Sequence, residues 1–151
     1  MNDSSSAIID RELCGPHGSE SLTHGVRVSV RPEFRPEHSD TAAGRYVFAY
    51  HIRIANQSDR RVRLLTRHWS IIDADGDVST VEGDGVVGEQ PSLEPGESFE
   101  YASWCPLETP WGTMEGSFGM IADPADTIRV RIGRFYLVSD AAEIEEAGRS
   151  L

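Results

Sequence analysis

The chain has 151 residues, which suits one domain with a single hydrophobic core. Acidic residues outnumber Lys and Arg by 25 to 14, so the formal net charge is -11 and most of the surface repels nucleic-acid phosphates. Apolar runs all fall short of the ~18 residues that a membrane-spanning helix needs. We therefore expect neither a nucleic acid nor a membrane as a partner.

The N-terminal residues 1–22 are polar and show no sustained periodicity, which predicts a flexible extension. Acids and serines stand where a signal peptide would carry basic residues and then an apolar stretch, so we expect a cytoplasmic protein. Cys14 and Cys105 form no CxxC or Cys/His pattern and are expected to be free thiols.

The domain itself is predicted to run over residues 23–138 as a series of strands. Residues 26–30 and 46–56 alternate apolar with polar or small side chains, the period of two that is typical of a half-buried strand. The segment DADGD separates two more alternating segments, and its Asp75 and Gly76 are expected to supply the positive φ values of a tight primed hairpin turn.

Three further strands are expected at residues 99–104, 115–123 and 127–138. With frequent turn signals and no amphipathic helix between them, about seven strands predict an all-β fold. The expected architecture is an antiparallel two-sheet β-sandwich of the fibronectin type III or immunoglobulin-like kind. In the acidic C-terminal tail, residues 139–151, Asp140 is suited to cap a short helix, although a helix of that length is marginal in water.

Arginines alternate with Val and Ile in the strand-like segments, a pattern that predicts the solvated face of a sheet. The arginines concerned are Arg27, Arg31, Arg53, Arg63, Arg67, Arg129 and Arg131.

The run GDGVVG, Gly83 to Gly88, spells GxGxxG, a pattern associated with dinucleotide binding. That function requires the run to open a helix, and Pro91, Pro95 and Gly96 follow too closely for one. Two interpretations remain. The glycines let a loop bulge where a β-carbon would clash, or their backbone N–H groups form a nest that binds phosphate or pyrophosphate.

For such a nest, Arg67 and His68 would supply positive charge if the hairpin brings them near the loop. The full set of candidate ligand-binding residues is Gly83, Asp84, Gly85, Val86, Val87, Gly88, Arg67 and His68.

Asp73, Asp75 and Asp77 alternate around a glycine, and bunched carboxylates are the ligands that Mg²⁺ or Ca²⁺ prefers. A hairpin tip is also rich in Asp and Gly for turn reasons alone, and the chain lacks the distal bidentate Glu of a calcium loop. The three aspartates are therefore metal candidates, and no cofactor is predicted.

Nucleophilic catalysis has no specific pattern in this chain. No GxSxG elbow occurs, and Cys105 precedes a proline without an obvious base. We expect a protein that is not an enzyme. Trp104 and Trp111 bracket a proline-rich segment, where they serve either as anchors for a partner or as seals at the end of the sandwich.

Four segments, RYVFAY (45–50), LLTRHWSI (64–71), VEGDGVVGEQPSLEPGE (81–97) and TPWGTMEGSFGM (109–120), occur in the order found in the bacterial ApaG family, which this chain resembles. The resemblance implies a fibronectin type III-like β-sandwich. It also implies a link to cobalt resistance and magnesium efflux, without catalytic residues that carry over. Related eukaryotic domains occur in F-box proteins and in a DNA polymerase-interacting protein.

From the resemblance and the residues together, we expect a non-enzymatic binding module for a protein partner or a second copy of the chain, since an exposed sheet edge can add a partner strand. One alternative is a sensor that binds a phosphorylated nucleotide or pyrophosphate at the glycine loop. A further alternative is a nucleotide hydrolase.

Overall fold

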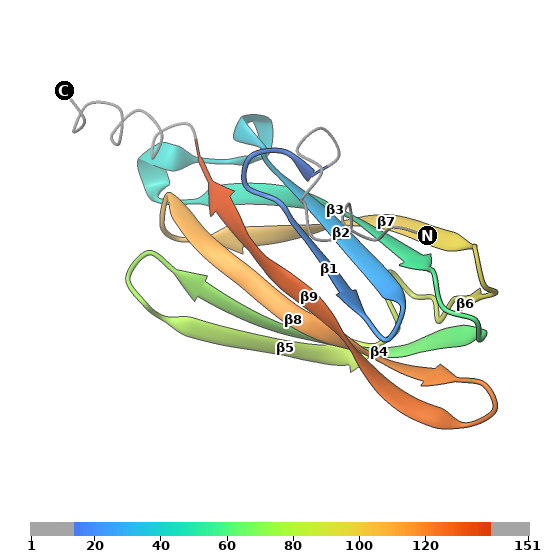
Figure 1. Cartoon of the computed structure of the whole chain (residues 1–151). Coiled ribbons are helices and arrows are strands. Elements are labelled where there is room, and N and C mark those ends of the chain that lie inside the picture. The colour runs from blue at the N-terminus through green and yellow to red at the C-terminus, as the bar shows by residue number, and fades with distance from the viewer. Residues whose placement is uncertain (1–13, 140–151) are drawn as a thin grey trace.

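The computed structural model describes residues 14–139, which form two antiparallel β-sheets packed face to face (Figure 1). One sheet has the order β1-β2-β3-β7, made of β1 (Ser19–Thr23), β2 (Val26–Phe34), β3 (Tyr46–Asn56) and β7 (Ser98–Leu107). The other has the order β5-β4-β8-β9, made of β5 (Val78–Asp84), β4 (Val62–Asp73), β8 (Trp111–Ala122) and β9 (Asp126–Val138), with the short β6 (Ser92–Leu93) also paired to β4. The predicted antiparallel β-sandwich is confirmed.

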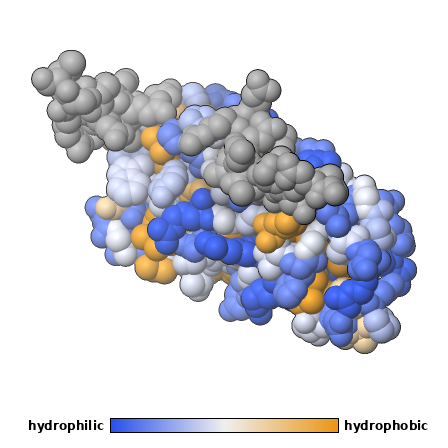
Figure 2. Space-filling model, in the orientation of Figure 1, coloured by the Kyte–Doolittle hydropathy of each residue, from blue (hydrophilic) through white to orange (hydrophobic). Residues whose placement is uncertain are grey.

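Short 3₁₀ turns at Pro36–His38 and Thr41–Ala43 join β2 to β3. Within residues 14–139, no helical segment has the length and hydropathy of a membrane-spanning helix. Hydrophilic residues cover most of the described surface in view in Figure 2, with smaller apolar patches between them.

The core lies between the two sheets and is built by the alternation that the sequence displays. Val28, Ile52 and Ile54 are fully buried, as their period of two requires of an inward face. Phe118 and Phe135 fill the space from the opposite sheet and are equally inaccessible to water. Burial of side chains this large contributes about 2–3 kcal/mol each to stability.

The strand count is nine rather than the seven expected, because β1 and β6 were not predicted. β1 lies partly within residues 1–22, which were expected to form a flexible extension, and residues 1–13 of that segment lie outside the described residues. β1 escaped prediction because it is polar. Its buried Ser19 donates to the carbonyl oxygen of Gly133 at 2.7 Å instead of offering an apolar side chain to the core.

The last described residue is Ser139, whose backbone N–H donates to the carbonyl oxygen of Pro110 at 3.0 Å. The short helix that Asp140 was expected to cap lies outside the described residues, as does the rest of the acidic tail from residue 140 onward.

The sandwich is closed along the side where β1 meets β9. Besides the bond from Ser19, the Ser21 hydroxyl donates to the carbonyl oxygen of Arg131 at 2.7 Å, and the N–H of Arg131 donates to the Thr23 hydroxyl at 3.2 Å. Polar side chains of an end strand thus satisfy backbone groups of the other sheet. On the opposite side of the sandwich, β5 and β7 are the end strands of the two sheets, and the candidate site lies between them.

The hairpin between β4 and β5 is wider than expected. Gly76 has φ of 85°, but Asp75 lies in the ordinary region of negative φ, so the primed two-residue turn is wrong. The Gly76 N–H donates to the carbonyl oxygen of Asp73, and the Asp73 N–H donates to the carbonyl oxygen of Asp77. This pattern is a turn followed by a single left-handed residue, the other common way to close a hairpin.

A β-bulge in β4 decides which side chains of that strand face the interior. The register against β8 shifts between Leu64 and Thr66. Leu64 therefore faces the core, and beyond the bulge the odd-numbered residues Arg67 and Trp69 face inward. Without this extra residue, strict alternation would have put Arg67 on the solvated face of the sheet.

Candidate functional site

An open cleft runs between the sheets on the side flanked by the edge strands β5 and β7. It has a volume of about 400 Å³ and is lined by inward side chains of β4, β5 and β7, among them Trp69, Val81 and Ser103. We call it the inter-sheet cleft. A smaller pocket of about 210 Å³ adjoins it and shares Tyr50, Arg67, Trp69 and Ser103 with it.

We call this smaller space the arginine pocket. Its lining comprises Tyr50, Arg67, Trp69, Val86, Val87, Gly88, Tyr101 and Ser103. The polar side-chain groups of these residues are one guanidinium, two phenols, one serine hydroxyl and one indole N–H, and the lining contains no carboxylate.

Arg67 is held by the glycine run that the sequence singled out. Its Nη1 donates to the carbonyl oxygens of Asp84 at 3.0 Å and Gly85 at 2.9 Å. A β-carbon at Gly83 would lie only 2.8 Å from the guanidinium carbon, so the guanidinium lies directly against this glycine. Gly83 thus permits the close approach of a charged side chain.

The remainder of the run closes over the β4 bulge. The N–H of Gly85 donates to the carbonyl oxygen of Leu65, a group that the bulge leaves available, at 2.8 Å. The N–H of Val86 donates to the carbonyl oxygen of Glu89, also at 2.8 Å, and the Val86 side chain is 1% exposed in the core. Two N–H groups of the expected anion nest are therefore used by the fold itself, which favours the structural interpretation of these glycines.

The structure separates the two residues that were expected to charge the loop. Arg67 faces the arginine pocket, whereas His68 projects from the opposite face of β4. His68 Nδ1 lies 2.8 Å from a carboxylate oxygen of Glu82 on β5, and its Nε2 lies 3.3 Å from the Thr66 hydroxyl. The two side chains therefore do not act on one ligand.

The tyrosines of the arginine pocket were predicted only as strand residues, not as site residues. Burial raises the pKa of Tyr101, and nearby Tyr50 raises it further, while Arg67 opposes both effects. Burial also raises the pKa of Tyr50, partly offset by the Ser103 hydroxyl. Both phenols consequently remain protonated hydrogen-bond donors at neutral pH. No sequence motif marks them, because their strands meet only in the folded sandwich.

Cys105 lies on the inner face of β7 at the inter-sheet cleft and is 4% exposed. Burial raises the pKa of its thiol to about 11. The thiol therefore stays protonated at neutral pH and is a poor nucleophile. Cys14 is also buried, and its Sγ lies 3.4 Å from the carbonyl oxygen of Ser19.

The two tryptophans occupy different sheets. Trp104 on β7 is 53% exposed, with the Arg35 guanidinium carbon 5.7 Å from its ring centroid and the His38 ring edge-on at 5.2 Å. Trp111 is 43% exposed and pairs with Val138 in the other sheet. Only Trp104 borders the inter-sheet cleft.

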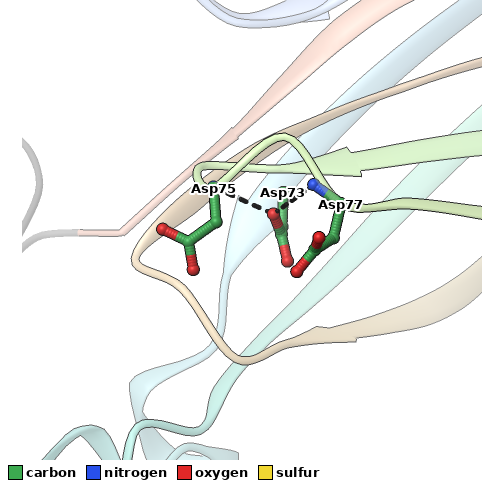
Figure 3. Close-up of side chains that lie close together, drawn as sticks. All are labelled: Asp73, Asp75 and Asp77. Carbon is green, nitrogen blue, oxygen red and sulfur yellow. Dashed lines mark hydrogen bonds between the residues drawn. The ribbon is translucent and has the colours of Figure 1, made fainter.

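The three aspartates of the hairpin tip do gather, with one possible ligand atom of each within 4.8 Å of the others (Figure 3). One carboxylate oxygen of Asp73 accepts the N–H of Asp75 at 2.9 Å and that of Asp77 at 3.0 Å. Asp73 therefore stabilises the turn through these two hydrogen bonds, which explains the aspartate at this position without a metal ion. Asp75 and Asp77 are exposed to solvent.

We predict that Asp73→Ala lowers the free energy of unfolding by about 1–2 kcal/mol, because two backbone N–H groups lose their acceptor. Asp73→Asn retains an acceptor oxygen and should change stability by less than about 0.5 kcal/mol. Urea denaturation followed by circular dichroism measures both. Equal losses in the two variants would mean that the charge of Asp73, and not its hydrogen bonds, stabilises the hairpin.

The model of the ApaG domain family matches residues 36–122, more than half of the chain. The chain belongs to the ApaG family. Protein ApaG of Anaeromyxobacter dehalogenans (strain 2CP-C) is 48% identical over 120 residues, covering 80% of this chain and 94% of that protein. Protein ApaG of Rhodospirillum centenum is 50% identical over 118 residues, covering 78% and 91%.

A crystal structure of the ApaA protein from Bordetella pertussis superposes on this chain with a TM-score of 0.74 at 43% identity, covering 83% of this chain and 98% of that one. The resemblance to the ApaG family that the four sequence segments indicated is therefore confirmed. The ApaG match spans β3 to β8, and so contains Tyr50, Arg67, Tyr101 and the glycine run.

Proposed function

We propose that this ApaG-family chain is a non-enzymatic binding module of the cytoplasm that docks an extended segment of a partner protein between the edge strands β5 and β7. The observation that carries the proposal is the contrast between the two sides of the sandwich. Hydrogen bonds close the β1–β9 side, whereas the β5–β7 side presents two end strands that flank the inter-sheet cleft.

An end strand offers unpaired backbone groups to an added strand. Apolar side chains at this side support such an addition: Val81 on β5 is 40% exposed, Val87 in the following loop 55%, and Trp104 on β7 53%. A partly exposed Trp beside a cleft is the kind of residue that dominates binding energy at interfaces.

Charge narrows the chemistry of the partner. Glu82 and Asp84 lie on β5, Asp77 and Glu108 line the inter-sheet cleft, and the whole chain carries a net charge of -11. We therefore propose a docking segment that alternates apolar with basic residues. Electrostatic complementarity of this kind speeds association and weakens as salt is raised.

The matched variants Trp104→Ala and Trp111→Ala test the surface. Both remove an exposed indole of similar exposure, but only Trp104 borders the cleft. Each variant serves as bait for capture from native cells, the captured protein is identified, and its Kd is measured with purified components. We expect Trp104→Ala to weaken the Kd by about 30-fold, the loss of roughly 2 kcal/mol, and Trp111→Ala to leave it within about twofold. Equal losses, or none, would remove the proposed surface.

We further propose that the family association with cobalt resistance and magnesium efflux acts through that partner, and not through a metal bound at Asp73, Asp75 and Asp77. The support is the role of Asp73 as a turn acceptor. In a native-host strain lacking the gene, Asp73→Asn should restore growth on cobalt and Trp104→Ala should not. The reverse pattern would point to the aspartates as the functional element.

A further inference from the structure

The arginine pocket contains a buried hydroxyl group without a hydrogen-bond partner. Tyr101 is 7% exposed, and its phenol oxygen has no partner among the described residues. Leaving such a group unsatisfied costs folding stability, and native proteins rarely do so without a reason. The Tyr101 side chain lines a space of about 210 Å³, which is large enough for several atoms beyond a single water molecule.

Arg67 supplies a fixed positive charge to the same pocket. Its Nη1 is engaged by the carbonyl oxygens of Asp84 and Gly85, and Gly83 leaves space for the guanidinium plane. The Nε and Nη2 groups make no hydrogen bond to any residue in the described range 14–139. The loop therefore sets the orientation of the guanidinium while leaving donors unused.

The unsatisfied groups of this pocket are thus donors. Arg67 can only donate, and Tyr101 keeps its proton because burial raises its pKa. The complementary chemical group is an acceptor with negative charge, since a charge-assisted hydrogen bond to a guanidinium is about twice as strong as a neutral one. No carboxylate lines the pocket to compete for these donors, although the protein as a whole is acidic.

We propose that the arginine pocket binds the phosphate or carboxylate group of a small organic anion, with Arg67 and Tyr101 donating to its oxygens. The organic part of the ligand extends into the inter-sheet cleft, which shares Tyr50, Arg67, Trp69 and Ser103 with the pocket. The donors are side chains from β4 and β7, so this site differs from a nest made of glycine N–H groups. It also does not depend on the proposed partner protein.

NMR titration of the full chain at constant ionic strength tests the site. The probes are inorganic phosphate, phenyl phosphate and benzoate, with sodium chloride as the reference salt. We expect saturable shifts of the Arg67 side-chain N–H and of the backbone N–H groups around Tyr101. A response to phenyl phosphate alone identifies a phosphate site, and a response to benzoate alone identifies a carboxylate site. No saturable shift with any probe would overturn the proposal.

The decisive variant is Tyr101→Phe, which removes one oxygen atom and leaves the core intact. We expect it to weaken binding of the responding probe by about tenfold, the loss of one hydrogen bond to a charged group, while the melting temperature stays equal or rises. Tyr136→Phe is the matched control, because Tyr136 is 45% exposed on β9. Unchanged affinity in Tyr101→Phe would show that this hydroxyl does not contact the ligand and would overturn its assignment.

Failure of this site and failure of the proposed protein-docking surface can be told apart. Trp104→Ala should weaken the Kd of the partner without altering the titration with inorganic phosphate, which has no organic part to reach the cleft, since Trp104 does not line the arginine pocket. Tyr101→Phe should alter the probe titration. A chain that captures its partner but ignores all three anions retains the docking function and lacks the anion site.

Discussion

Asn56→Ala is expected to lower the free energy of unfolding by about 3–4 kcal/mol, one of the two largest effects of a single substitution that we predict. The Asn56 side chain is completely buried at the end of β3. Its Nδ2 donates to the carbonyl oxygens of Arg60 at 2.8 Å and Leu93 at 2.9 Å. Its Oδ1 accepts from both the N–H and the hydroxyl of Ser58.

The loss is large because alanine leaves polar groups buried without partners. Each orphaned acceptor or donor costs about 1–3 kcal/mol, and groups in one network are more costly together than apart. Asn56 also links the sheets, since it ends β3 while Leu93 belongs to β6 of the opposite sheet. Its loss therefore weakens the joint between the layers as well as one turn.

Equilibrium urea unfolding measures this effect, with the neighbouring Gln57→Ala as the control. Gln57 is exposed, and its side chain accepts one hydrogen bond from Arg27 at 3.2 Å. Gln57→Ala should change stability by less than about 0.5 kcal/mol. A loss below about 1 kcal/mol for Asn56→Ala would mean that water replaces the amide and that the network is not structurally required.

Gly85→Ala is expected to lower the free energy of unfolding by about 2–5 kcal/mol. Two separate costs add at this position. Gly85 has φ of 65°, which costs an L-residue about 1–2 kcal/mol. A β-carbon there would also lie 2.4 Å from the carbonyl oxygen of Glu89, and this backbone atom cannot rotate away. Relieving such an overlap costs about 1–3 kcal/mol more.

Gly88→Ala separates these two costs within the same loop. Gly88 has φ of 82°, but a β-carbon there would meet nothing within 4 Å. Gly88→Ala should therefore show only the backbone cost of about 1–2 kcal/mol. The two variants are compared by urea unfolding monitored by tryptophan fluorescence. Equal losses would show that the loop moves freely away from Glu89 and is not held against the bulge.

The agreement between sequence and structure is closest where alternation is strict. The valines of β2 and the isoleucines of β3 face the core as their period of two predicts, because a strand presents successive side chains to opposite faces. The expectation fails at β1, which interacts through serine hydroxyls. A strand held by polar contacts to another sheet has no apolar period by which to recognise it.

For the candidate site, sequence reasoning selected Arg67 and the glycine run but not their relation. The sequence analysis expected Arg67 and His68 to supply positive charge to the same loop. Adjacent residues of a strand point to opposite faces, so only Arg67 reaches the pocket. It also placed Arg67 among the arginines of a solvated face. The β4 bulge turns Arg67 toward the interior instead, and a single sequence contains no clear pattern that predicts a bulge.

The amino-acid sequence by itself determined the all-β class, most of the strands and the ApaG family, because periodicity and local motifs are properties of short segments. Only the tertiary structure decided which side of the sandwich is open and which residues share a pocket. Tyr50, Arg67 and Tyr101 meet through pairing of distant strands, and the register that joins them depends on the β4 bulge and on long-range hydrogen bonds. Contacts between distant strands depend on how the whole core packs and not on any one segment of the sequence.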